Sequence, residues 1–210
     1  MRSRSESNTR AAYRRSGPVA TITGFDGRRN RLRLFLFERT FDKLDTMATW
    51  SEFAHAAPSL AAGVRGVFHQ YGPGLGYLAT IRPDGGPRLH PVSPIVTDDG
   101  LFGCLLDTPK RRDLERDGRY ALHAYPPDDS DDEACVRGRA RRITDESIVR
   151  RVARLTRATP QVAWQLFALD IDTAFLVRRP VGRGAAMAQV WHAPPTDGRE
   201  SRLQFTIRPS

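Results

Sequence analysis

Residues 76–106, GYLATIRPDGGPRLHPVSPIVTDDGLFGCLL, contain three short apolar runs separated by two turn-forming segments. The runs at 76–81, 87–96 and 101–106 have the length of β-strands, and the PDGG and TDDG segments between them are rich in residues that tight turns require. Neighbouring strands joined by such short turns pair antiparallel. The stretch therefore predicts three consecutive strands of an antiparallel sheet.

Similar signals continue in both directions along the chain. Further strands are predicted at 119–125, 134–143, 166–170, 173–179 and 187–191, and helices at 50–57, 59–70 and 145–157. A chain with about eight short strands, and helices only at a few joints, favours an antiparallel barrel over a doubly wound sheet. No glycine-rich dinucleotide-binding motif lies between a strand and a helix, so a Rossmann fold is not expected.

Composition narrows the class of protein. The chain has 210 residues, 40% hydrophobic and 27% charged, so most of it is expected to fold around a core. It contains no apolar run long enough for a membrane-spanning helix, and no apolar segment follows the N-terminal MRSRSESNTR as in a secretory signal. Two cysteines, Cys104 and Cys135, are too few for a disulfide framework or a four-thiolate zinc site. These features predict a soluble cytoplasmic protein without a bound metal.

The positive charge is concentrated near the N-terminus. Residues 1–46 contain eleven Arg or Lys and five Asp or Glu, a net charge of +6 out of the +9 of the whole chain. Binding of single-stranded nucleic acid would need aromatic side chains among these arginines for base stacking, and only Tyr13 lies inside the arginine cluster. A nucleic-acid partner is therefore not expected.

By composition the chain divides into three parts. Residues 1–46 form a basic N-terminal extension, expected to be poorly ordered or to form a weak hairpin in which Asp26-Gly27 joins 19–25 to 32–37. Residues 47–194 form the folded domain, and residues 195–210 form a C-terminal tail with no clear place in it. Met47 stands directly before the domain, which leaves open whether the natural protein starts at Met1 or at Met47.

The segment DTPKRRDLERDG, residues 107–118, has the signals of a short helix. Thr108 suits the N-cap, Pro109 is favoured as the first helical residue, and Gly118 suits the position where the helix ends. Lys110 and Arg111 then add positive charge to the positive end of the helix dipole, which typically costs about 0.3–1 kcal/mol. Either this is an ordinary solvated turn, or an anion such as phosphate binds there and reverses the sign of the interaction.

A neighbouring strand carries further positive charge. In GPRLHPVSPI, Arg88, His90 and Val92 alternate onto one face of a regular strand, and Leu89 and Pro91 onto the other. A strand with Arg and His on one face, close in sequence to the Lys110 turn, favours the anion interpretation. His90 alone is more typical of a surface or packing histidine.

Three segments in order along the chain resemble the flavin-binding split-barrel family: LATIRPDGGPRLHPV, DTPKRRDL and RDGRYALHAY. This family comprises the relatives of pyridoxamine 5′-phosphate oxidase and includes deazaflavin-dependent members. The likeness extends less tightly over residues 50–194. It implies a mainly β fold, a split β-barrel of six to eight mostly antiparallel strands. It also implies FMN, or alternatively a deazaflavin, bound at the interface of a homodimer, and hydride transfer to or from a small substrate.

Site residues also follow from the resemblance. Arg88 and Lys110 match positions that hold the flavin phosphate, with Thr108 and Arg111 beside them. The backbone that lines the flavin ring and ribityl chain matches Leu89, His90, Pro91, Val92, Leu106 and Asp107. Trp191 matches a late aromatic residue that approaches the flavin from the partner subunit, although a core tryptophan on a last strand remains an equal alternative.

The C-terminus departs from the family pattern. The oxidase that names the family has a C-terminal Arg-x-His element, which HAPPTDGRESRLQFTIRPS does not match. Oxidation of pyridoxamine phosphate is therefore not expected, and no side chain is assigned as a catalytic acid or base. An alternative in a different class is a non-catalytic protein that holds a flavin or haem in a split barrel.

Overall fold

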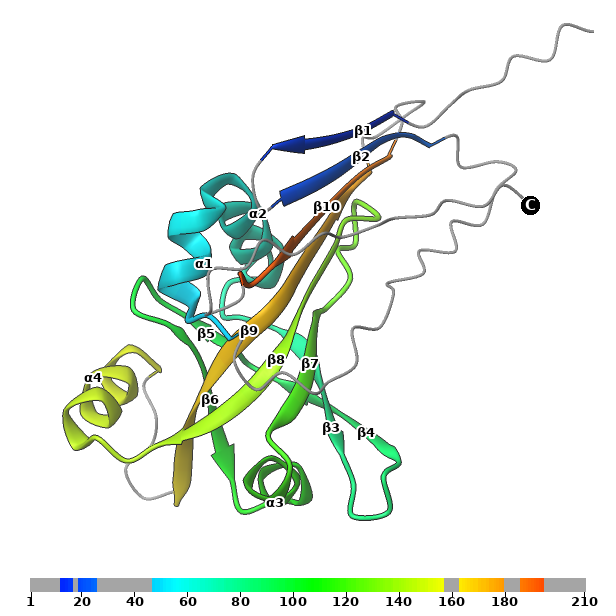
Figure 1. Ribbon diagram of the computed structural model, residues 1–210. Helices are drawn as coiled ribbons and strands as arrows, with labels where there is room; N and C mark the ends of the chain where they lie inside the picture. Colours follow the sequence, from blue (N-terminus) through cyan, green and yellow to red (C-terminus); the bar gives the residue numbers. More distant parts are fainter. Residues whose placement is uncertain (1–11, 17–18, 26–46, 157–162, 180–185, 195–210) are drawn as a thin grey trace, which may run out of the picture.

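The computed structural model describes residues 12–16, 19–25, 47–156, 163–179 and 186–194 (Figure 1). The helices are α1 (Trp50–Ala56), α2 (Pro58–Phe68), α3 (Pro109–Arg116) and α4 (Glu146–Thr156). The strands are β1 (Ala12–Ser16), β2 (Val19–Phe25), β3 (Gly76–Ile81), β4 (Pro87–Val92), β5 (Ile95–Val96), β6 (Leu101–Leu106), β7 (Arg119–Ala124), β8 (Glu133–Ile143), β9 (Trp164–Arg178) and β10 (Ala186–His192).

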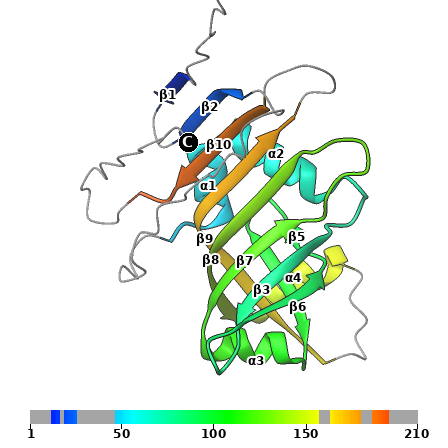
Figure 2. The ribbon, with the colours of Figure 1, turned by 90° about the vertical axis from the view of Figure 1, so that its right-hand side faces the viewer.

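All the strand pairs in these residues are antiparallel, and together they form one curled sheet. Its main order is β1-β2-β10-β9-β8-β7-β3-β4, while β6 pairs with the first part of β9 and with β5. The long strand β9 therefore pairs with β8 along one edge. Along its other edge it pairs first with β6 and then with β10. Both views show the sheet wrapping into an open barrel, with α3 across one end (Figures 1 and 2). The predicted mainly β, antiparallel barrel is confirmed.

The strands predicted around the PDGG and TDDG turns form where expected. β3 and β6 have the predicted bounds, and β3 pairs with β4 across the first turn. The predicted strand at 87–96 is instead divided into β4 and β5 by Ser93-Pro94. A proline has no backbone N–H to give to a neighbouring strand, which explains the interruption.

The two strands predicted at 166–170 and 173–179 form one strand, β9, of 15 residues. The prediction of a break was wrong, because the polar residues at this point are paired rather than solvated in a loop. Asp170 accepts a hydrogen bond from Arg141 Nε at 3.3 Å, and Asp172 accepts one from Arg137 Nε at 3.1 Å. The β8–β9 pairing shifts register between Arg137 and Gly138, and β9 continues past this bulge without a break.

Part of the N-terminal extension belongs to the sheet. β2 pairs with β10 on one edge and with β1 on the other, so both of its hydrogen-bonding edges are used by these two neighbours. Residues 32–37, the expected hairpin partner of β2, lie outside the described residues, as does the tail 195–210.

Apolar side chains from both faces of the curled sheet fill two cores. The larger core lies between the sheet and the helices α1 and α2, and includes Trp50, Phe53, Phe68 and Trp191. The smaller one lies under α4 and gathers Phe102, Val152, Leu166 and Ala168. In the described part of the chain, no helix is long and apolar enough to cross a membrane.

Helix α1 begins with a capping box, which gives a first testable prediction. Glu52 N–H donates to the Thr49 hydroxyl at 3.2 Å, and Thr49 N–H donates to the Glu52 carboxylate at 2.7 Å. The hydrogen bonds that the Thr49 N–H and the Thr49 hydroxyl donate to the Glu52 carboxylate hold the pKa of Glu52 below its usual value. We expect Thr49→Ala to lower the free energy of unfolding by about 1 kcal/mol. Urea unfolding followed by circular dichroism measures this, with Thr49→Ser as a control that retains the cap; an equal loss in both variants would contradict the capping explanation.

Candidate anion-binding site

The basic helix α3 starts where the sequence predicts. Thr108 is its N-cap in an extended conformation, and Pro109 is its first residue. The Thr108 hydroxyl does not cap the helix but donates to the Leu106 carbonyl oxygen at 3.2 Å. The first turn contains no acidic residue that would offset the positive end of the helix dipole. The position of the helix start is confirmed, and the start remains electrostatically suited to an anion.

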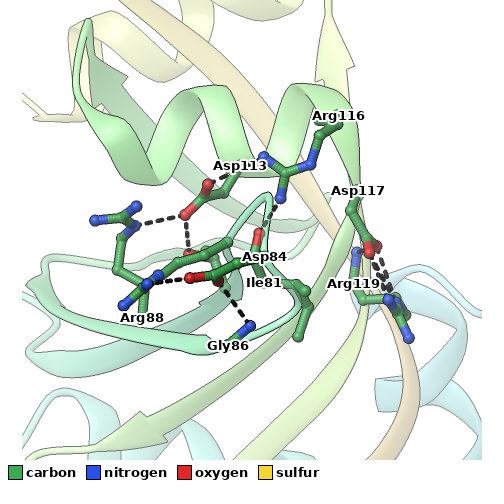
Figure 3. A network of polar contacts seen from close by, with 10 residues as sticks. Ile81, Asp84, Gly86, Arg88, Asp113, Arg116, Asp117 and Arg119 are labelled. Atoms are coloured by element: carbon green, nitrogen blue, oxygen red, sulfur yellow. Dashed lines mark hydrogen bonds and ion pairs between the residues drawn. The ribbon is translucent and has the colours of Figure 1, made fainter.

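A buried carboxylate in the middle of α3 ties the helix to the sheet. Asp113 is only 2% exposed, and its Oδ2 accepts hydrogen bonds from the Thr80 hydroxyl at 2.9 Å and from Arg88 Nε at 2.7 Å. Arg116 donates to the other carboxylate oxygen at 3.3 Å and also to the Ile81 carbonyl oxygen. Asp113 lies between Arg88 and Arg116 (Figure 3). We call Thr80, Arg88, Asp113 and Arg116 the Asp113 network.

The electrostatics of this network favour the ionised carboxylate. Burial by itself would raise the pKa of Asp113. The hydrogen bonds from Arg88, Thr80 and Arg116 outweigh that effect and leave the pKa below its usual value. Asp113 is therefore a fixed negative charge that neutralises part of the positive charge around it.

Arg88 reaches Asp113 with only part of its guanidinium. The strand β4 alternates as predicted, with Arg88, His90 and Val92 half-buried and the residues between them exposed. Arg88 donates from Nε to Asp113, and within the described residues no hydrogen bond joins its two terminal nitrogens to the protein. Figure 3 shows a single dashed line from the Arg88 guanidinium to Asp113. Arg88 therefore has free donors for a ligand.

Lys110 lies on the same face of α3, one turn before Asp113. Its Nζ donates to the Pro91 carbonyl oxygen at 3.2 Å, which connects the start of α3 to the end of β4. No carboxylate among the described residues pairs with Lys110, and partial burial lowers its pKa. Lys110 is thus a cation whose charge is not balanced by a side chain and which retains hydrogen-bond donors.

His90 lies on the same side of β4 as Arg88. Its Nε2 is buried and has no hydrogen-bond partner among the described residues. Burial lowers the pKa of His90, and the nearby positive charges of Lys110 and Arg88 lower it further. The imidazole is therefore neutral at pH 7, with an unpaired ring nitrogen beside two cations. We call Arg88, His90 and Lys110 the anion site.

The other basic residues of α3 are already paired. Arg111 contacts Asp107 at 2.8 Å and Glu115 at 3.5 Å, and Arg112 donates to Asp107 at 3.2 Å. Arg111 therefore differs from Lys110 in having carboxylate contacts, although its buried Nε has no hydrogen-bond partner among the described residues.

The remaining predicted residues differ in their surroundings. Leu89 and Leu106 are exposed apolar side chains, at 63% and 47%, and Asp107 is also exposed. Trp191 is fully buried in the larger core, where its ring centroid lies 4.8 Å from that of Phe53. The structure does not bring Trp191 to the anion site of its own chain.

Thr80 and Asp113 are the residues that the sequence prediction missed. A threonine on the apolar face of β3, whose burial alternates regularly, needs a buried partner, and this is the one signal that the sequence offered. Asp113 sits within the charged run KRRDLER, where a solvated helix face is the ordinary interpretation. Its burial becomes evident only when β3, β4 and α3 are assembled.

The arrangement is chemically suited to a phosphate group. Two cations with free donors, held by a strand and a helix start, offer charge-assisted hydrogen bonds to a tetrahedral anion. In the described residues there is no cluster of His, Cys, Asp and Glu that would hold a metal ion.

No protein-family model and no curated protein matches this sequence. Among solved structures, the chain is similar to General Stress Protein 26 from Bacillus anthracis str. Sterne, with 20% identity, a TM-score of 0.45, and coverage of 55% of this chain and 91% of that chain. It is also similar to a heme binding protein from Mycobacterium smegmatis, with 19% identity, a TM-score of 0.45, and coverage of 59% of this chain and 57% of that chain. A third similar structure is a putative pyridoxamine 5′-phosphate oxidase from Listeria innocua, with 14% identity, a TM-score of 0.45, and coverage of 53% of this chain and 92% of that chain.

Proposed function

We propose that the anion site binds the phosphate of FMN and that the protein is an FMN-dependent oxidoreductase acting on a small molecule. The observation that carries the proposal is that two cations with free donors lie where α3 meets β4, Arg88 bound to Asp113 and Lys110 bound to the Pro91 carbonyl oxygen. Lys110 differs from the other basic residues of α3, which contact carboxylates. A cation without a carboxylate partner, near the same His90 as an arginine with free donors, supports a ligand that supplies the acceptors.

The charge of the site agrees with a phosphomonoester. Asp113 balances part of the charge of Arg88 and Arg116, and Lys110 adds a further positive charge. A phosphate near neutral pH carries between one and two negative charges.

In the proposed enzyme the flavin supplies the hydride chemistry, and the protein supplies position and electrostatics. Arg88 and Lys110 hold the phosphate. Leu89 and Leu106 offer exposed apolar surface against which a ring system packs. We further propose a homodimer with the flavin at the subunit interface, as the resemblance implies, and, from the composition, a cytoplasmic location.

The experiment compares FMN with riboflavin, which lacks the phosphate, by fluorescence titration of the full chain. We expect the wild type to bind FMN more tightly than riboflavin. We expect Lys110→Ala to weaken FMN binding about 10- to 100-fold, the usual loss for one charge-assisted hydrogen bond, and to leave riboflavin binding unchanged.

Arg112→Ala is the matched control, because Arg112 is the second residue after Lys110 in the same helix, is 66% exposed, and is paired with Asp107. It removes one positive charge from α3 without touching the anion site, so FMN affinity should change little. Equal losses for Lys110→Ala and Arg112→Ala would mean that only general charge attraction is involved. Absence of binding to either flavin in the wild type would refute the proposal, and a Soret band in the purified protein would identify haem instead.

A further inference from the structure

We infer that Asp113 is a positioning residue of the anion site: it holds Arg88 by its Nε and so directs the two terminal nitrogens toward the phosphate. This inference rests on the proposed function. It assigns the preference for a phosphorylated ligand to a buried carboxylate that does not itself contact the ligand.

The contact between the two residues uses one edge of the guanidinium. Arg88 Nε lies 2.7 Å from Asp113 Oδ2, a short charge-assisted hydrogen bond. A guanidinium is planar, so fixing one edge also fixes the direction of the remaining N–H groups. Those groups are the ones without a partner among the described residues. Asp113 thus determines where the free donors of Arg88 point.

Asp113 is itself held rigidly. The Thr80 hydroxyl donates to the same oxygen at 2.9 Å, and Arg116 donates to the other oxygen at 3.3 Å. The carboxylate is buried, so water does not compete for these bonds. A buried and fully bonded carboxylate is a better anchor for a long arginine side chain than an exposed one, whose ion pairs contribute little.

The same helix presents the second cation. Lys110 precedes Asp113 by one turn of α3 and reaches the Pro91 carbonyl, while Asp113 reaches Arg88 on the same strand β4. These two contacts between one helix and one strand hold both cations at the junction of α3 and β4. In this inference the Asp113 network positions Arg88 for the phosphate and does more than link α3 to the sheet.

The test uses the ratio of riboflavin to FMN dissociation constants, measured on the full chain. Asp113→Asn retains the size of the side chain but removes its charge. We expect this ratio to fall about tenfold or more, because Arg88 loses its anchor, while riboflavin affinity stays near that of the wild type. In an Arg88→Gln background, Asp113→Asn should change the ratio little further, since the residue it positions is gone.

Asp117→Asn is the matched control. It is the same substitution at the C-terminal end of the same helix, but Asp117 binds Arg119 and has no printed contact with Arg88 or Lys110 within the described residues. The ratio should therefore stay near the wild-type value even if stability falls. An equal loss of FMN and riboflavin affinity in Asp113→Asn would show a merely structural role and overturn the inference, as would an unchanged ratio.

If Asp113→Asn does not fold, Thr80→Val replaces it in the test, because it removes the hydroxyl that fixes Asp113 Oδ2 and keeps the shape of the strand residue. A reduced ratio in Thr80→Val supports the inference, and an unchanged ratio overturns it. Failure of the proposed function has a different signature, namely no preference for FMN in the wild type.

Discussion

Asp113→Ala is expected to lower the free energy of unfolding by about 2–4 kcal/mol, because it leaves Arg88 and Arg116 near the sheet without their shared carboxylate. A loss near 2 kcal/mol is expected if water solvates the two partly exposed arginines after the substitution. The Thr80 hydroxyl also loses its acceptor in a buried position. Urea unfolding at neutral pH, followed by tryptophan fluorescence, measures the loss.

The pH dependence of this loss follows from the direction of the pKa shift. The pKa of Asp113 is lower in the folded protein than its usual value, so the carboxylate stabilises the fold most above the unfolded-state pKa of about 3.9. That contribution is lost as the pH falls through the folded-state pKa. The difference in stability between the wild type and Asp113→Ala should therefore be largest near neutral pH and shrink in acid.

Asp84→Ala is the matched control. Asp84 pairs with Arg82 in the turn between β3 and β4 and accepts a hydrogen bond from the Gly86 N–H at 3.0 Å, and the side chains of Arg82 and Asp84 are exposed. Such pairs contribute at most about 1 kcal/mol, so the control should unfold close to the wild type. A similar loss in the two variants would contradict the special role of burial at Asp113.

The elements that sequence reasoning predicted well are those that local signals determine. The PDGG and TDDG turns delimit β3 and β6, and Thr108-Pro109 marks the start of α3. The alternation of β4 placed Arg88 and His90 on one face, because the side-chain period of a strand is a local property.

What sequence reasoning missed depends on contacts between distant segments. Asp113 and Thr80 are 33 residues apart, and nothing in KRRDLER distinguishes a buried aspartate from a solvated one. The continuity of β9 depends on Arg137, which reaches Asp172 from 35 positions away. Arg111, which the resemblance places beside the phosphate, contacts Asp107 and Glu115, and the sequence of α3 alone did not indicate these contacts.

Trp191→Ala is expected to have the largest effect on stability, about 3–5 kcal/mol, because it deletes a fully buried indole from the larger core. The ring packs against Phe53, and β10 is fixed between β9 and β2, so the surrounding backbone has little freedom to close the cavity. Chemical unfolding followed by circular dichroism avoids dependence on the fluorescence of the deleted tryptophan.

Trp191→Phe separates a core role from a cofactor role. Trp191 Nε1 is buried without a hydrogen-bond partner among the described residues, so a phenyl ring fills much of the same space and removes an unsatisfied donor. We expect this variant to recover most of the stability lost in Trp191→Ala, at a cost of about 1–2 kcal/mol relative to the wild type. FMN affinity should then equal that of the wild type. A stable Trp191→Phe protein with strongly reduced FMN affinity would instead favour contact between this side chain and the flavin of a partner subunit.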